Sequence, residues 1–266
     1  MVLKLKNMLV LWLKGICVGG SMMVPGVSGG SMAMVFGVYD RLIDAVANFL
    51  KNKLRNLIFL AVFAFGGIIG VVILSRPISY LLTAYPVPTS SFFFGAVIGG
   101  IPIIFKQGEI KLKPINIVPL LVGALCVLLI TLIPNNIMND SIWSTLLSGF
   151  FGSLALVLPG ISVSFVLLVF GAYDNLLAAV NSFDLSFLVP FALSMLVGIL
   201  ACTKLIDYCF KRFKQVSFLI VLGFVLGSLV ELFPGVPTGL DILLSIITLV
   251  VGFYFIFLLS KCTDNV

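Results

Sequence analysis

The chain of 266 residues is 61% hydrophobic and only 10% charged, with 16 Lys and Arg against 10 Asp and Glu. About a quarter of the residues of a soluble domain are charged, so this composition excludes a soluble protein and predicts an integral membrane protein. The absence of histidine excludes histidine-dependent phosphatases and Ser-His hydrolases. The 5 cysteines share no repeated spacing, so we expect neither a disulfide framework nor a metal site.

The first predicted element is a broken helical hairpin at about residues 8–48. The basic start and the apolar run of this element would also suit a cleaved secretory signal peptide. A similar apolar segment, which ends at Leu158, recurs within the chain, so we expect the first element to be retained as part of the folded protein. Pro25 and Gly26 interrupt the apolar run where a membrane helix would be continuous. Each arm is short for a crossing and carries charge, which favours a re-entrant hairpin over two crossings.

Three apolar runs follow this hairpin and complete a first unit at residues 1–134. A second hairpin and three further runs make up a second unit at residues 135–266. Each run is long enough to cross a hydrocarbon core of about 30 Å as a helix. The predicted spans are at about 57–75, 89–105 and 115–133 in the first unit; the second unit has its hairpin at about 142–182 and its spans at about 187–203, 217–233 and 240–260.

The second unit repeats the sequence of the first. Pro25 to Val46 reads PGVSGGSMAMVFGVYDRLIDAV and Pro159 to Val180 reads PGISVSFVLLVFGAYDNLLAAV, with about half of the positions identical. The match continues into the next span, where Gly70 parallels Gly198. The sequence therefore predicts a duplicated unit that forms one integrated membrane domain.

The placement of charge predicts how the two units lie in the membrane. Basic residues flank both ends of the first hairpin, whereas acidic residues flank the second. Positive charge marks the cytoplasmic side of short loops, and one path through the membrane leaves every Lys and Arg except Arg76 on that side. Three spans per unit is an odd number, so the second unit enters the membrane inverted. We expect an all-α polytopic protein with an inverted-topology repeat and with both termini in the cytoplasm.

The hairpin tips are candidate anion sites. Small residues and serine hydroxyls lie where a helix would start after each Pro-Gly, and free N–H groups at a helix start attract anions. The second tip keeps the serines but has no glycine pair. A structural alternative stays open, in which Pro-Gly only turns the chain and the serines cap a helix. The predicted phosphate-binding residues of the tips are Ser28, Gly29, Gly30 and Ser31 in the first hairpin and Ser162 and Ser164 in the second.

Charged residues near the predicted membrane are further candidates. Arg41 could donate two hydrogen bonds to a phosphate, and Asn175 takes its place in the second copy. Lys14, Arg76 and Lys204 are secondary candidates, for which snorkelling to the interface is an equally good explanation.

Two carboxylates and three glycine pairs also have two interpretations. Asp40 and Asp174 follow a tyrosine in matching positions, either as proton-coupling carboxylates or as capping acids beside an interfacial anchor. Close helix packing is the expected role of the glycine pairs, which are Gly66 with Gly70, Gly95 with Gly99 and Gly223 with Gly227.

Two copies of Pro-Gly-x-Ser followed by Phe-Gly-x-Tyr-Asp, the first extended to Pro-Gly-Val-Ser-Gly-Gly, resemble the bacterial polyprenyl-phosphate transporter family. The resemblance covers nearly the whole chain. It implies a plasma-membrane flippase that returns undecaprenyl phosphate, the carrier lipid of cell-wall synthesis, from the outer to the inner leaflet. The implied partners are the polyprenyl-phosphate lipid and membrane lipids, without nucleic acid or cofactor, and a homodimer is left open.

Two other functions remain as alternatives. A small-anion or ion-coupled solute transporter would also use broken helices with serine and glycine tips, but it would need a sealed aqueous vestibule instead of a lateral opening to lipid. A non-transporting assembly factor would have no polar pocket of phosphate size. An enzyme is the least favoured, because the sequence offers no nucleophile with a matching base.

Overall fold

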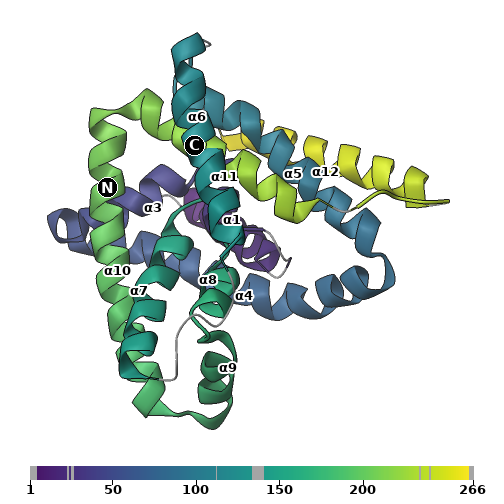
Figure 1. Cartoon of the computed structure of the whole chain (residues 1–266). Helices are drawn as coiled ribbons and strands as arrows, with labels where there is room; N and C mark the ends of the chain where they lie inside the picture. Colours follow the sequence, from purple (N-terminus) through teal and green to yellow (C-terminus); the bar gives the residue numbers. More distant parts are fainter. Residues whose placement is uncertain are drawn as a thin grey trace.

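The computed structural model describes residues 5–22, 24, 27–111, 113–133, 141–233, 235–239 and 241–263. These residues form α-helices and short 3-10 helices without any strand, so the predicted all-α class is confirmed (Figure 1). Pro25 and Gly26 of the first repeat motif lie outside the described residues.

The two halves of the chain have the same order of helices. In each, a helix of the first hairpin arm is followed by two short helices and then by three long ones. The first half contains α1 (Leu5–Ser21), α2 (Gly29–Val35), α3 (Tyr39–Ala47), η1 (Phe49–Asn52), α4 (Lys53–Ala84), α5 (Pro86–Gln107), η2 (Pro114–Asn116) and α6 (Ile117–Thr131). The second half contains α7 (Ile142–Val157), α8 (Val163–Val169), α9 (Tyr173–Ser182), α10 (Leu185–Arg212), α11 (Lys214–Leu232) and α12 (Asp241–Thr263).

In the described part of the chain, 4 helical segments are long and apolar enough to cross a membrane. They are Phe49–Ala84, Pro86–Gln107, Leu185–Arg212 and Asp241–Leu258, and shorter apolar helices include Pro114–Ile130 and Lys214–Val230. Outward-facing residues of the long helices are apolar: Val72 on α4 is 67% exposed and Leu196 on α10 is 53% exposed. The chain is a multi-pass membrane protein.

The helix that contains the first predicted span is longer than that span. The expected span ends at residue 75, before Arg76 and Pro77, but α4 continues through both to Ala84. A charge followed by a proline is a reasonable stop signal, since an internal proline removes one backbone hydrogen bond. Beyond Pro77, Ile78 is buried and Leu82 packs against the core.

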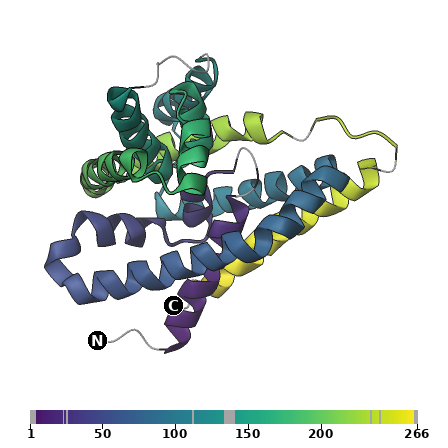
Figure 2. The ribbon, with the colours of Figure 1, turned by 90° about the horizontal axis from the view of Figure 1, so that it is seen from below.

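Glycines bring the long helices together in four pairs: α1 with α4, α5 with α12, α6 with α11, and α7 with α10. A Cβ atom on Gly70 would clash with the carbonyl oxygen of Ile16, and one on Gly95 would clash with that of Leu249. Only glycine lets the two backbones approach this closely. Figures 1 and 2 both show α5 and α12 lying side by side. The glycine pairs predicted to serve close packing do so.

The members of a pair run in the same direction. Gly66 contacts Trp12 and Gly70 contacts Ile16, so four residues along α4 match four residues along α1. Because α1 and α4 are parallel, the segment between them, which contains α2 and α3, returns the chain to the side where α1 begins. Contacts in the other three pairs increase along both helices in the same way, so these pairs are also parallel. The contacts are Gly95 with Leu249 and Gly99 with Phe253 between α5 and α12, Leu120 with Gly223 and Ala124 with Gly227 between α6 and α11, and Leu146 with Ser194 and Phe150 with Gly198 between α7 and α10.

The short helices of the two hairpins have the same local geometry. Gly37 and Gly171 follow α2 and α8 with φ of 67° and 68°, a left-handed conformation that glycine adopts without strain. The Val38 amide then donates to Ala33, and the Ala172 amide donates to Leu167 in the same way. The repeated Phe-Gly-x-Tyr-Asp sequence therefore encodes one turn, which is formed twice.

Candidate functional site

The tip of the first hairpin contains two buried serines. Ser28 is 5% exposed and Ser31 is 2% exposed, and neither hydroxyl has a hydrogen-bond partner in the described part of the protein. Ser28 occupies the N-cap position of α2 with extended backbone angles, yet its side chain makes no capping hydrogen bond. A buried hydroxyl without a partner costs about 1–3 kcal/mol. The tip thus has two buried hydroxyl groups without a partner among the described residues.

Glycines at this tip allow other segments to approach it. A Cβ atom on Gly29 would lie 2.8 Å from the sulfur of Met22, and one on Gly30 would lie 3.1 Å from the Cα atom of Pro159. Pro159 belongs to the second Pro-Gly motif. The two repeated motifs, far apart in the sequence, therefore meet at Gly30.

An apolar cavity of about 470 Å³ lies against the same tip. Gly29 and Gly30 form part of its wall, and most of the rest is aliphatic or aromatic, with side chains from α1, α3, α4, α7 and α10. The Tyr39 hydroxyl donates a 2.8 Å hydrogen bond to the Val157 carbonyl oxygen, and both residues line the cavity. This bond ties α3 of the first hairpin to the end of α7, next to Pro159.

The second hairpin tip differs from the first. Ser162 is the N-cap residue of α8, and it is half-buried without a capping hydrogen bond. Ser164 lies in the first turn of α8, and its side chain is outside the described part. Val163 and Ser164 stand where the first tip has Gly29 and Gly30, and neither Ser162 nor Val163 lines the apolar cavity.

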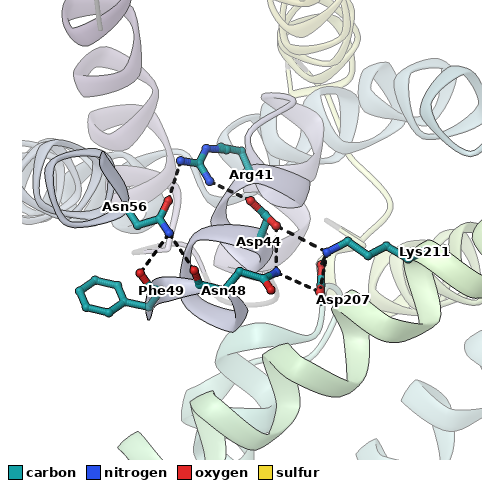
Figure 3. A network of polar contacts seen from close by, with 7 residues as sticks. All are labelled: Arg41, Asp44, Asn48, Phe49, Asn56, Asp207 and Lys211. Atoms are coloured by element: carbon teal, nitrogen blue, oxygen red, sulfur yellow. Dashed lines mark hydrogen bonds and ion pairs between the residues drawn. The ribbon is translucent and has the colours of Figure 1, made fainter. Parts of the chain in front are cut away.

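Arg41 lies in a polar network between α3, α4 and α10 (Figure 3). Its guanidinium donates to Asp44 at 2.9 Å and to the Asn56 side chain at 2.8 Å. Across the network, Lys211 of α10 lies 3.6 Å from Asp44 and 2.7 Å from Asp207. Asn48 bridges the two aspartates, with hydrogen bonds of 3.0 and 3.1 Å.

The structure separates Arg41 from the serine tip. Leu42 and Val46 of α3 line the apolar cavity, whereas Arg41 and Asp44 line a second, polar cavity of about 280 Å³. The arginine and the glycines of the tip thus belong to two different cavities. The tip donors are hydroxyl groups, and the cationic donors lie elsewhere.

The remaining candidates lie outside both cavities. Lys14 is half-buried on α1, and Arg76 and Lys204 are exposed on α4 and α10. Asp40 and Asp174 are exposed in the first turns of α3 and α9. Among the described residues, no cluster of Cys, Asp or Glu could hold a metal ion.

Sequence reasoning missed several residues that organise this region. Tyr39 was noted only as part of the repeated motif, and its bond to Val157 depends on the meeting of the two hairpins. No sequence pattern predicted the contacts of Asn56 with Arg41, of Asp207 with Asn48 or of Lys211 with Asp44, because these partners are distant along the chain or belong to the other half. The pair of Lys211 with Asp207 is local, since these residues are four positions apart on α10.

The parallel pairs of long apolar helices define a multi-pass membrane protein. The chain belongs to the undecaprenyl phosphate translocase-like family, whose profile matches residues 18–243. It is 32% identical over 246 residues to a polyprenyl-phosphate transporter of Vibrio cholerae serotype O1, covering 87% of this chain and 79% of the relative. It is 31% identical over 270 residues to a polyprenyl-phosphate transporter of Staphylococcus aureus, covering 94% and 95%.

No solved structure matches the chain. The family inferred from the repeated motifs is confirmed by the profile and by both relatives.

Proposed function

We propose that this protein is a transporter of polyprenyl phosphate, with undecaprenyl phosphate as its substrate, and not an enzyme. It works as a flippase in the bacterial plasma membrane and returns the carrier lipid from the outer to the inner leaflet. The observation that carries the proposal is the pair of buried, unpartnered hydroxyls of Ser28 and Ser31 beside an apolar cavity. The names of the two relatives support the same substrate.

The two parts of the site suit the two parts of this lipid. A phosphate needs hydrogen-bond donors when it leaves water, because an unpaired polar group in an apolar medium costs several kcal/mol. Ser28 and Ser31 supply such donors at the first tip. The cavity of about 470 Å³ has the size of a ligand pocket and mainly apolar walls, so it can hold the first prenyl units.

The directions of the helix pairs support an inverted repeat of residues 1–134 and 135–266. Consecutive spans run in opposite directions across a membrane. The helix α5 is the second span of its unit, and α12 is the third span of the other unit. If the two units had the same orientation in the membrane, these helices would therefore be antiparallel. They are parallel, and so are α6 and α11, as two inverted units require.

The lengths of the hairpin arms support re-entrant segments. The outgoing arm, α1, has 17 residues, which is at the lower limit for crossing a hydrocarbon core of about 30 Å. The returning arm is shorter still, since Gly37 divides it into α2 and α3 with 7 and 9 residues. Both tips would then lie within the membrane, one entering from each side.

Contacts between basic segments support a common cytoplasmic side, with both termini there. Lys211 lies 3.6 Å from Asp44 at the foot of the first hairpin, and Lys214 lies 2.6 Å from Glu109 in the loop after α5. All four groups belong to segments that the positive-inside rule assigns to the cytoplasm. The hydrogen bond from Lys214 lowers the pKa of the exposed Glu109, so this carboxylate is ionised at neutral pH.

A small-anion transporter is the second candidate. Its site would need a polar vestibule, and the mainly apolar wall of the cavity at Gly29 and Gly30 favours the lipid instead. An assembly factor without a substrate would need neither the unpartnered hydroxyls nor the polar cavity around Arg41.

The proposal is tested with the purified protein in vesicles that contain a fluorescent polyprenyl phosphate. The fluorescence of lipid on the outer face of the vesicles is quenched by an added reagent. The rate at which lipid crosses the membrane is then measured from the change in fluorescence with time. In vesicles with the Ser28→Ala/Ser31→Ala variant, the lipid should cross the membrane at least about 10-fold more slowly than with wild type. Each hydrogen bond from a hydroxyl to a charged phosphate contributes about 1.5–3 kcal/mol of binding free energy. Ser245→Ala is the matched control, since that hydroxyl is also buried and unpartnered but lies on α12.

Wild-type protein that moves the lipid no faster than empty vesicles would overturn the proposed function. A serine variant that moves it at the wild-type rate would remove these hydroxyls from the mechanism.

A further inference from the structure

A second cavity lies where the first hairpin joins α4, and its lining is entirely polar. Four charged residues, Arg41, Asp44, Lys51 and Arg55, surround a volume of about 280 Å³, and three asparagines complete the wall. This volume is just below the range of about 300–1,000 Å³ found for pockets that hold drug-sized ligands. The cavity is therefore suited to a head group and not to a whole lipid.

The charges of this cavity leave two cations without compensation. Arg41 is paired with Asp44 at 2.9 Å, and Lys211 approaches the same carboxylate at 3.6 Å. The side chains of Lys51 and Arg55 are exposed and make no hydrogen bond or ion pair with any described residue. A phosphate monoester carries a charge of about −1.5 to −2 at pH 7, which matches two free cations.

The wall behind these two cations is fixed. Asn56 is 3% exposed and accepts a 2.8 Å hydrogen bond from Arg41. The Asn56 amide in turn donates to the carbonyl oxygen of Asn48 at 3.1 Å (Figure 3). The Arg41 guanidinium also lies over the Phe59 ring. A preorganised wall lowers the entropy lost when a ligand binds. Lys51 and Arg55 can then close on an anion from the open side.

The position of the cavity along the chain points to a lipid. No charged residue occurs from 57 to 75, so the apolar part of α4 begins directly after Asn56. Around the cavity, Leu50 is 76% exposed, Leu54 is 71% exposed and Leu57 is 54% exposed. Basic residues followed by outward-facing apolar ones are typical of the boundary between head groups and hydrocarbon.

We propose that this cavity binds the phosphate monoester of a membrane lipid at the surface, as a docking site separate from the serine tip. The proposed transport function supplies only the identity of that lipid as polyprenyl phosphate. Free inorganic phosphate has the same chemistry, but it would gain nothing from the exposed leucines beside the cavity. Lys51 and Arg55 are the residues that bind the incoming phosphate, and Arg41 is the fixed cation behind them.

The test uses the full chain in phosphatidylcholine nanodiscs and the equilibrium binding of radiolabelled inorganic phosphate. Lys51→Gln/Arg55→Gln should weaken this binding at least about 10-fold, since two charge-assisted hydrogen bonds are lost. The control Lys53→Gln/Lys113→Gln removes the same number of charges from exposed lysines that do not line the cavity, and it should bind like wild type.

A second arm separates the two sources of phosphate. Polyprenyl monophosphate included in the wild-type nanodisc should displace the bound inorganic phosphate, while phosphatidylcholine alone should not. Failure of this displacement would assign the cavity to free phosphate and overturn the lipid site. Equal weakening in both double variants, or none in either, would overturn the cavity as a binding site.

These readouts do not depend on transport. If vesicles show no lipid movement but the binding results hold, the proposed function fails and the phosphate site stands. Ser28→Ala/Ser31→Ala should bind inorganic phosphate at the polar cavity like wild type, because those serines do not line it.

Discussion

Gly30 of the first hairpin lies directly against Pro159 of the second, where a Cβ atom would come within 3.1 Å of the proline Cα and N atoms. The contact joins the two copies of the Pro-Gly motif at one point. It also explains why the first copy has a glycine at this position, while the second copy has Ser164 at the equivalent one.

Gly30→Ala should force the two tips apart by a few tenths of an ångström and slow lipid movement in vesicles. Overpacking of this kind costs about 1–3 kcal/mol, so the unfolding temperature should also fall. Gly152→Ala is the control, because its Cβ atom would lie 3.6 Å from Leu167, an ordinary contact. Equal transport by the two variants would show that the spacing of the tips is unimportant.

The hydroxyls of Ser28 and Ser31 should lower the thermal stability of the ligand-free protein and contribute to the binding of polyprenyl phosphate. Ser28→Ala/Ser31→Ala removes two buried hydroxyls that lack partners, so the ligand-free variant should unfold at the wild-type temperature or above it. Added polyprenyl phosphate should raise the unfolding temperature of wild type more than that of the variant. A variant that is strongly destabilised without ligand would indicate a structural role for these hydroxyls.

Two adjacent glycines on α4 should respond in opposite ways to the same change. A Cβ atom on Gly66 would clash with the carbonyl oxygen of Trp12, whereas one on Gly67 would lie 3.8 Å from that of Gly15. Gly66→Ala should therefore separate α1 from α4 and lower the unfolding temperature. Gly67→Ala should be neutral or stabilising by up to about 1 kcal/mol, because alanine is the better helix former. Similar losses in both would argue against the α1–α4 packing.

The inverted repeat predicts opposite sides for two exposed positions. In a cysteine-free background, Asn52→Cys should react with an impermeant thiol reagent from the cytoplasmic side, and Phe183→Cys should react from the outside. Both residues lie at the foot of a hairpin, and Phe183 is 81% exposed. Labelling of both from the same side would contradict the inverted orientation of the second unit.

The sequence alone was sufficient for the features that depend on local pattern. Apolar runs identified the long helices, and the glycine pairs indicated the close contacts, since a missing side chain has the same consequence wherever two helices cross. The duplicated motif identified the family. The length of the first long helix was not evident from the sequence, because α4 continues past the predicted end of the span at residue 75, through Arg76 and Pro77, to Ala84.

The tertiary structure decided which candidates belong together. Ser28 and Arg41 lie 13 positions apart in one motif, and the sequence suggested a single phosphate site. In the folded protein, the glycines of that tip line an apolar cavity and Arg41 lines a polar one. The two cavities are separate because they lie against different faces of α3. Tyr39 and Asp44 each have a partner in the second half of the chain, at Val157 and Lys211. No local pattern encodes such contacts, because they arise only when the two halves pack against each other.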